Sequence, residues 1–182
     1  MIKVSEPDKP ITLQGFSVLP PKGENWQYVK PDETTIFFFK KGQDETHTFV
    51  VRAQGAILPA KSTAPKENFL ESIRSEQLEQ QSKTKYKYYD NEFALTEEKN
   101  TLCVRNHSMW KDYASKHIPE SEPYLVGEEI GLVCRHPDKN NTYNVGVFLV
   151  YSQRAKEADL IDIREDADYF FQNMTFEPLD SK

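Results

Sequence analysis

The stretch Ile130–Arg154, IGLVCRHPDKNNTYNVGVFLVYSQR, decides the fold, because it joins two apolar, β-branched segments through a polar turn. Residues typical of turns lie between the two segments: Pro137, Asp138, Asn140 and Asn141. The pattern predicts a β-hairpin. In its second segment both alternating faces are apolar, with Val145, Val147, Leu149 and Tyr151 on one side and Phe148 and Val150 on the other. We therefore expect a central strand that is covered on both faces.

Shorter segments outside this hairpin predict further strands. Each combines β-branched or aromatic residues with a two-residue period and ends at Pro, Gly, Asn or Asp. The predicted strands are 11–18, 34–40, 46–53, 85–96 and 102–110. Within 85–96, Asp90 and Asn91 indicate a bulge or bend, and Asn100 indicates the next turn. Residues 111–123, with Pro119 and Pro123, lack periodicity and predict a long loop.

Two segments have helical periodicity instead. The first follows the loop 59–65, where Ser62 and Thr63 are candidate helix caps. Its apolar stripe is expected to comprise Phe69, Leu70, Ile73 and Leu78. The second begins near Asp162, with Glu165 completing a variant of the capping box. Its apolar stripe is expected to comprise Ile163, Ala167, Phe170, Phe171 and Met174.

These elements predict an α+β fold, a mostly antiparallel β-sheet packed by helices as an α/β/α sandwich. A chain of 182 residues suits one domain. We expect a flexible N-terminal arm at 1–10, a single domain at 11–179 and a tail at 180–182.

The charge and hydropathy of the chain limit which partners we expect it to bind. A net charge of −6 disfavours nucleic acid, because binding to phosphates needs concentrated Lys and Arg. No apolar run approaches the roughly 18 residues of a transmembrane helix. The first ten residues lack the apolar segment of a signal peptide, although Met1 could also replace a removed leader. We expect a periplasmic or cell-envelope location if a leader was removed, with membrane anchoring only if that leader was lipidated, and a cytoplasmic location otherwise.

The order of these elements and several short sequence segments resemble the PsbP-like fold family, in particular its bacterial DcrB-like and lipoprotein-type members. The resemblance rests on GFSVLPPKGENWQYV at 15–29, the strand pair after it, the mid-chain helix, and VYSQR at 150–154 followed by FFQNMTF at 170–176. It covers about residues 11 to 178 and implies an α/β/α sandwich without intrinsic catalysis that serves protein contacts. The chain lacks the lipobox cysteine of the lipoprotein members.

The two cysteines, Cys103 and Cys134, suggest either a disulfide or two separate thiols. If their strands are antiparallel neighbours with Cys103 opposite Cys134, then Arg105 lies opposite Leu132 and His107 opposite Ile130. A disulfide further requires Cα atoms within about 7 Å. The polar neighbours of Cys103 and the apolar neighbours of Cys134 count against a shared face. The alternatives therefore remain open.

A zinc site formed by Cys103, His107, Cys134 and His136 is the rival interpretation. In the same register, His107 and His136 lie in opposite directions from the cysteine pair, about 20 Å apart at about 3.4 Å per residue. We therefore predict no metal site and no cofactor. The sequence also lacks a P-loop, a dinucleotide fingerprint, HExxH and G-x-S-x-G. It therefore predicts a protein that is not an enzyme.

Arg, His, Tyr and Trp side chains near the ends of the hairpin and elsewhere are the remaining candidates for a site. They could line a cleft or a contact surface, because Arg, Tyr and Trp dominate interface energies. Alternatively, the aromatic side chains fill the core and the arginines extend over it. The candidates are Arg135, His136, Tyr151, Arg154, Trp26 and Trp110.

We expect a noncatalytic protein-interaction or cell-envelope-associated domain whose partner is another protein. The alternative is a small-molecule or lipid-binding domain that uses a cleft beside the 130–154 hairpin.

Overall fold

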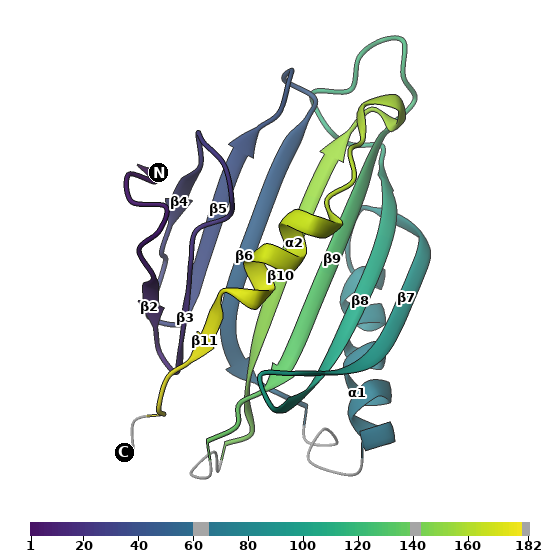
Figure 1. Ribbon diagram of the computed structural model, residues 1–182. Helices are drawn as coiled ribbons and strands as arrows, with labels where there is room; N and C mark the ends of the chain where they lie inside the picture. The colour runs from purple at the N-terminus through teal and green to yellow at the C-terminus, as the bar shows by residue number, and fades with distance from the viewer. Residues whose placement is uncertain (60–65, 139–142, 180–182) are drawn as a thin grey trace.

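An eight-stranded antiparallel sheet organises the computed structural model, which describes residues 1–59, 66–138 and 143–179 (Figure 1). The strand order is β1-β4-β5-β6-β10-β9-β8-β7. The strands are β1 Ile2–Lys3, β4 Gln27–Val29, β5 Thr35–Lys41, β6 Thr48–Ile57, β7 Lys87–Glu98, β8 Thr101–Asp112, β9 Leu125–Arg135 and β10 Val145–Ala155. Helix α1 (Lys66–Ser82) and helix α2 (Arg164–Gln172) pack on the sheet, and a short 3₁₀ helix spans Glu157–Asp159. The predicted α+β class is confirmed.

The predicted central hairpin is confirmed as β9 and β10. Leu132 lies opposite Leu149, and Ile130 lies opposite Tyr151. Part of the predicted turn, Asn140 and Asn141, lies outside the described residues, as do Ser62, Thr63 and the predicted tail at 180–182. β10 also pairs with β6 along almost its whole length. It therefore has a long hydrogen-bonded neighbour on each side.

The N-terminal part of the chain differs from the predicted single strand at 11–18. It forms two short strands, β2 (Ile11–Leu13) and β3 (Phe16–Val18), which pair with each other in antiparallel orientation. Gly15, between them, has a φ of 84°, which glycine adopts without steric cost and which reverses the chain. β11 (Met174–Phe176) pairs with the other edge of β3 and completes a three-stranded sheet. Met174 was predicted within the terminal helix but lies in this strand.

The first ten residues, predicted as a loose arm, include β1. Ile2 and Lys3 pair with Tyr28 and Gln27 of β4. The β7–β8 hairpin agrees more closely with the sequence. Its turn residues Lys99 and Asn100 both have positive φ, and the register shifts between Tyr88 and Asp90, as the predicted bulge requires.

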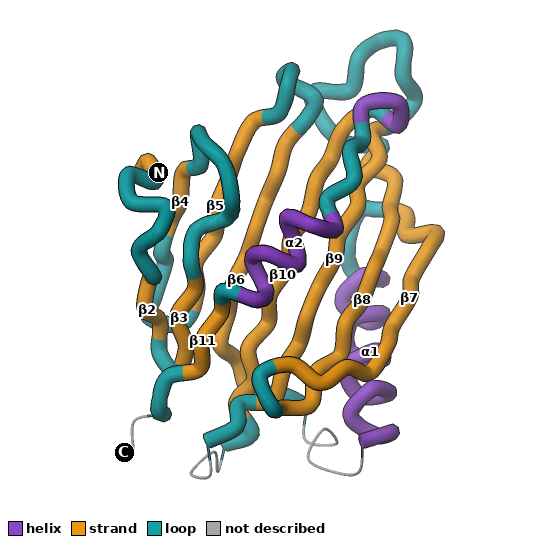
Figure 2. Tube along the Cα trace, in the orientation of Figure 1, coloured by secondary structure: helices purple, strands orange, loops and turns teal. Residues whose placement is uncertain are grey.

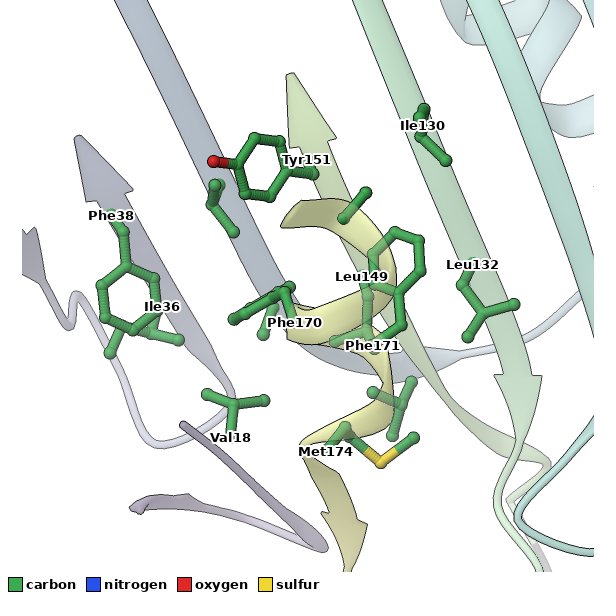
Figure 3. Packing of buried hydrophobic residues seen from close by; sticks show 14 of the residues in the cluster. Val18, Ile36, Phe38, Ile130, Leu132, Leu149, Tyr151, Phe170, Phe171 and Met174 are labelled. Atoms are coloured by element: carbon green, nitrogen blue, oxygen red, sulfur yellow. The ribbon is translucent and has the colours of Figure 1, made fainter. Parts of the chain in front are cut away.

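One face of the large sheet carries the main core, against α2 and the three-stranded sheet (Figure 3). Ala167, Phe170 and Met174 are fully buried there, as the predicted apolar stripe requires. They pack on inward side chains of four neighbouring strands, among them Phe38, Val51, Leu132 and Leu149. The predicted capping box is not formed: the cap residue is Ile163 and makes no side-chain cap hydrogen bond. Instead, Asp162 Oδ1 accepts a hydrogen bond from the backbone N–H of Arg164.

The opposite face carries α1 and a smaller core (Figure 2). Phe69 and Ile73 are buried against Val104 and Val133, which alternate with the residues facing α2. Leu78 was predicted in the same buried stripe, but its side chain is 37% exposed. In the last two turns of α1, the side chains that face the sheet are Gln77 and Gln81 instead. α1 is therefore apolar toward the sheet in its first half and polar in its second half.

Both faces of β10 were predicted to be covered, and the face on the α1 side is covered only in part. Val147, Leu149 and Tyr151 are buried on the α2 side, but Phe148 and Val150 on the other side are only half-buried. α1 covers β7, β8 and the adjoining part of β9, and does not extend across β5 and β6 (Figure 1). The helix layers therefore lie on opposite faces as predicted, but the α1 layer is partial.

The α2 core yields a stability prediction. Phe170→Ala removes a fully buried ring at the centre of the core, so we expect a loss of about 3–5 kcal/mol in the free energy of unfolding. Gln172→Ala, at an exposed position of the same helix, should change it by less than about 0.5 kcal/mol. Urea denaturation of the two variants measures both values. If both variants lost similarly little free energy of unfolding, Phe170 would not lie at the centre of the core.

Candidate functional site

Three of the six candidate residues lie on the α2 side and are buried. Trp26 is 1% exposed and packs edge-on against Tyr151, with ring centroids 6.2 Å apart. Burial and nearby Asp166 raise the pKa of Tyr151. His136 Nε2 donates to the carbonyl oxygens of Gly15 and Glu177, and its Nδ1 accepts from the N–H of Asp138. These hydrogen bonds connect the end of β9 to the three-stranded sheet, so His136 stabilises the fold.

The other three candidates lie on the α1 side: Trp110 and Arg154 flank Gly127 of β9, whereas Arg135 lies at the opposite end of that strand. The Arg135 guanidinium stacks over the Phe69 ring at 4.5 Å from its centroid. Arg154 donates to the carboxylate of Asp112, which is completely buried, at 2.9 Å. The Trp110 indole lies over Gly127, where a Cβ would come within 2.0 Å of the ring. The six residues therefore do not form one cleft or contact surface. Their arrangement favours the alternative in which aromatics fill the core and arginines extend over it.

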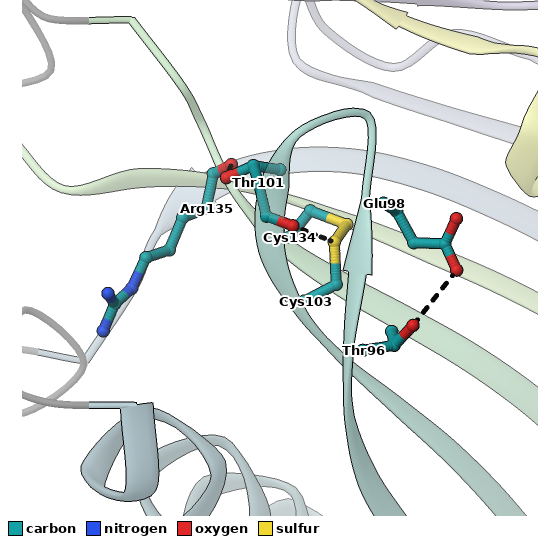
Figure 4. Close-up of a disulfide and its surroundings, with 6 residues drawn as sticks. All are labelled: Thr96, Glu98, Thr101, Cys103, Cys134 and Arg135. Carbon is teal, nitrogen blue, oxygen red and sulfur yellow. Dashed lines mark hydrogen bonds between the residues drawn. A yellow bond between two sulfur atoms is a disulfide. The ribbon is translucent and has the colours of Figure 1, made fainter.

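The two cysteines are joined by a disulfide between the neighbouring strands β8 and β9 (Figure 4). Cys103 lies directly opposite Cys134 with Cα atoms 4.1 Å apart. Of the two alternatives left open by the sequence, the disulfide is the one found, and the register has Arg105 opposite Leu132 and His107 opposite Ile130. The polar neighbours of Cys103 do not prevent a shared face. Arg105 reaches the carboxylate of Asp168 on α2 and stacks on Phe171, so it lies at the rim of the core.

The bridge engages both cysteines of the zinc alternative, so neither is a free thiolate ligand. His107 bonds to Glu128, and His136 makes the backbone contacts given above. Within residues 1–59, 66–138 and 143–179, no group of three or more His, Cys, Asp or Glu side chains is placed to hold a metal ion.

A groove of about 450 Å³ lies between the second half of α1 and the sheet, beside the central hairpin. Its helical wall includes Gln77, Gln80 and Gln81, and its apolar floor includes Phe148 and Val150. Three hydrogen bonds hold this part of the helix over the sheet: Gln77 Nε2 donates to Asn106 Oδ1, and Gln81 Nε2 donates to Asn91 Oδ1 and to Ser108 Oγ. The groove is therefore formed where α1 turns polar side chains inward.

Charged side chains of opposite sign meet in this groove. Arg52 of β6 and Glu129 of β9 both line it, and the two charges interact across β10. Burial raises the pKa of Glu129, whereas Arg52 and Asn106 lower it by less. Tyr88 lies nearby, since burial and then the Glu129 charge raise its pKa. Burial thus favours the neutral form of Glu129.

Sequence reasoning did not find this group. Adjacent acidic residues such as Glu128 and Glu129 lie on opposite faces of a strand, a pattern that favours two solvated charges, whereas burial raises the pKa of Glu129. One signal was present in the sequence: Phe69, Ile73, Gln77 and Gln81 are spaced at four residues. This spacing places two amides on the same helical face as two core residues.

Beyond the groove, the same face of the sheet is uncovered by any helix in the described residues. We call its half-buried apolar residues, Val29, Phe37, Phe39 and Val50, the open face. The Phe37 and Phe39 rings stack with centroids 6.2 Å apart. A hollow of about 840 Å³ at its end is lined by Val29, Phe39 and Val50, with Lys41 and Arg154 at the rim. An uncovered apolar face of this kind is typical of an interaction surface.

The disulfide predicts a thiol count. Protein denatured without a reductant should show no titratable thiol, and after reduction it should show two, because the chain has two cysteines and both are bonded. A thiol-reactive chromophore measures both counts. Two thiols before reduction would reject the bridge.

Glu129 predicts a pH-dependent stability. Below the ordinary carboxyl pKa of 4.5, Glu129 is protonated in the folded and unfolded states alike. Above its raised folded pKa, the charged form penalises only the folded state, so stability is lost as pH rises through that value. Glu129→Gln should therefore raise the melting temperature at pH 8, and this gain should vanish toward pH 4.5. Glu97→Gln, at an exposed position, should show no such trend. A pH-independent gain for Glu129→Gln would contradict the burial argument.

No protein-family model matches this chain, and no curated protein matches it. A solution structure of cyanobacterial PsbP (CyanoP) from Synechocystis sp. PCC 6803 is similar to it, with a TM-score of 0.41 and 10% sequence identity. The similarity covers 93% of this chain and 92% of that chain. At this level it carries no inference about function, and membership among the DcrB-like and lipoprotein-type proteins stays a prediction. In the described part of the chain, no helix is long and apolar enough to cross a membrane.

Proposed function

We propose that this protein is a noncatalytic interaction domain that binds another protein on the open face. The observation that carries the proposal is the asymmetry of the large sheet. Its α2 side is covered by a helix and a second sheet, whereas Phe37, Phe39 and Val50 on the other side remain half-exposed. Exposed apolar area of this extent is unfavourable in water unless a partner covers it.

Charge supports a particular kind of partner. The chain carries a net charge of −6, yet Lys41 and Arg52 lie on the open side of the sheet. Neither side chain forms an ion pair with another described residue, although Arg52 interacts at longer range with Glu129. A partner segment with apolar side chains flanked by Asp or Glu would match both features. The disulfide supports an oxidising compartment, such as the cell envelope, as the place where the two proteins meet.

Site-specific photo-crosslinking tests this proposal. A photoreactive phenylalanine analogue at position 39 should form a discrete adduct with another protein in cells of the native host. The same analogue at Tyr143, which is 74% exposed and outside the open face, should not. Equal labelling at both positions, no adduct at position 39, or an adduct only with a second copy of this chain would contradict the proposal.

A small-molecule-binding role is the second candidate. The groove under α1 favours it, because the groove lies beside the central hairpin and its volume falls within the range of ligand pockets. Its mixed polar and apolar lining suits a polar small molecule better than the hydrocarbon chain of a lipid.

A further inference from the structure

The side chains around the groove under α1 differ from those of the open face in their hydrogen-bonding capacity. Four glutamines line the groove: Gln54, Gln77, Gln80 and Gln81. An amide side chain both donates and accepts hydrogen bonds. Gln77 and Gln81 use part of this capacity in holding α1 to the sheet. Gln54 and Gln80 make no side-chain hydrogen bond to another described residue and remain available to a ligand.

The charges of the lining select against a charged ligand. Arg52 is the one cationic side chain among the described residues that line the groove, and Glu76 and Glu129 are the acidic ones. An anion would be attracted to Arg52 but repelled by the Glu76 carboxylate, and a cation would be attracted to Glu76 but repelled by Arg52. Burial favours the uncharged form of Glu129, so it adds no charge that selects either ion. An uncharged ligand avoids both conflicts and can still accept hydrogen bonds from Arg52 and exchange them with Glu129.

The apolar part of the groove adds a shape requirement. Phe148 and Val150 of β10, which are only half-buried, offer hydrocarbon surface beside the amides. A ligand must therefore present carbon-bound hydrogens on one side and hydrogen-bonding groups at its edges. A hydroxyl group donates one hydrogen bond and accepts others, so it matches amide partners better than a carboxylate, which only accepts, or an ammonium group, which only donates.

We propose that the groove between α1 and strands β6, β10 and β9 binds an uncharged polyhydroxylated molecule the size of a mono- or disaccharide. The volume of about 450 Å³ accommodates such a molecule. Gln80 hydrogen-bonds its hydroxyl groups from the helix, Gln54, Arg52 and Glu129 bind it from the sheet, and Phe148 contacts its apolar side. This inference rests on the second candidate function, small-molecule binding.

Saturation-transfer difference NMR on the full chain tests the ligand class. The probes are glucose, maltose and myo-inositol, with hexanoate and hexylamine as charged probes of comparable carbon content. We expect transfer to at least one polyol and to neither charged probe. Transfer to hexanoate or hexylamine without transfer to any polyol would overturn the ligand class but retain a small-molecule site. Transfer to none of the five would overturn the ligand class and count against the second candidate function.

Variants locate the binding within the molecule. Gln54→Leu keeps the approximate volume of the side chain but removes its hydrogen-bonding groups, so we expect at least a tenfold weaker affinity for the polyol. Gln43→Leu, the same change in an exposed loop outside the groove, should leave the affinity unchanged. Thermal unfolding of both variants verifies folding, and Gln80→Leu repeats the test from the helical wall. Polyol binding that survives both groove changes would overturn the assignment to this site.

Discussion

The packing of α2 against β10 and β9 is the interaction on which the rest of the structure depends. Because side chains alternate along a strand, burying Leu149 and Tyr151 under α2 sends Phe148 and Val150 to the opposite face. The same alternation on β6 and β9 places Arg52 and Glu129 there as well. One apolar helix on one face thus determines which side chains are available for binding on the other.

The amount of open surface follows from the course of α1. Its first half has Phe69 and Ile73 toward the sheet and packs on Val104 and Val133, as a core helix does. Its second half has Gln77 and Gln81 toward the sheet, where they bond to Asn106, Asn91 and Ser108. These side-chain hydrogen bonds hold the second half of the helix on the sheet without close packing of apolar side chains. A polar groove therefore lies at the edge of the helix, and the apolar open face continues beyond it.

The sequence predicted those features that depend on a strong local pattern. The central hairpin and the β7–β8 turn follow from alternation and turn residues, and the structure agrees with them. Features set by tertiary packing were predicted less well. Leu78 has the spacing of a buried residue, but the sheet beneath that turn presents polar side chains, so the glutamines face inward instead. Met174 continues the apolar period of α2, but pairing of Thr175 with Ser17 converts this segment into a strand. The spacing of Gln77 and Gln81 after Phe69 and Ile73 indicated the polar wall of the groove, but its other residues come from strands far apart in sequence, so no local pattern indicated the whole groove.

The disulfide has a structural consequence beyond its own two strands. Next to Cys103 and Cys134, on the reverse face, Val104 lies opposite Val133, and these valines are the platform for Phe69 and Ile73. A shift of β8 against β9 by one residue would turn the platform away from α1, and the bridge opposes such a shift covalently. The disulfide therefore fixes the position of the two valines against which α1 packs. Because α1 forms one wall of the groove, the disulfide also helps to fix that wall. The oxidised state of the cysteines and the shape of the candidate site are coupled through this single row of the sheet.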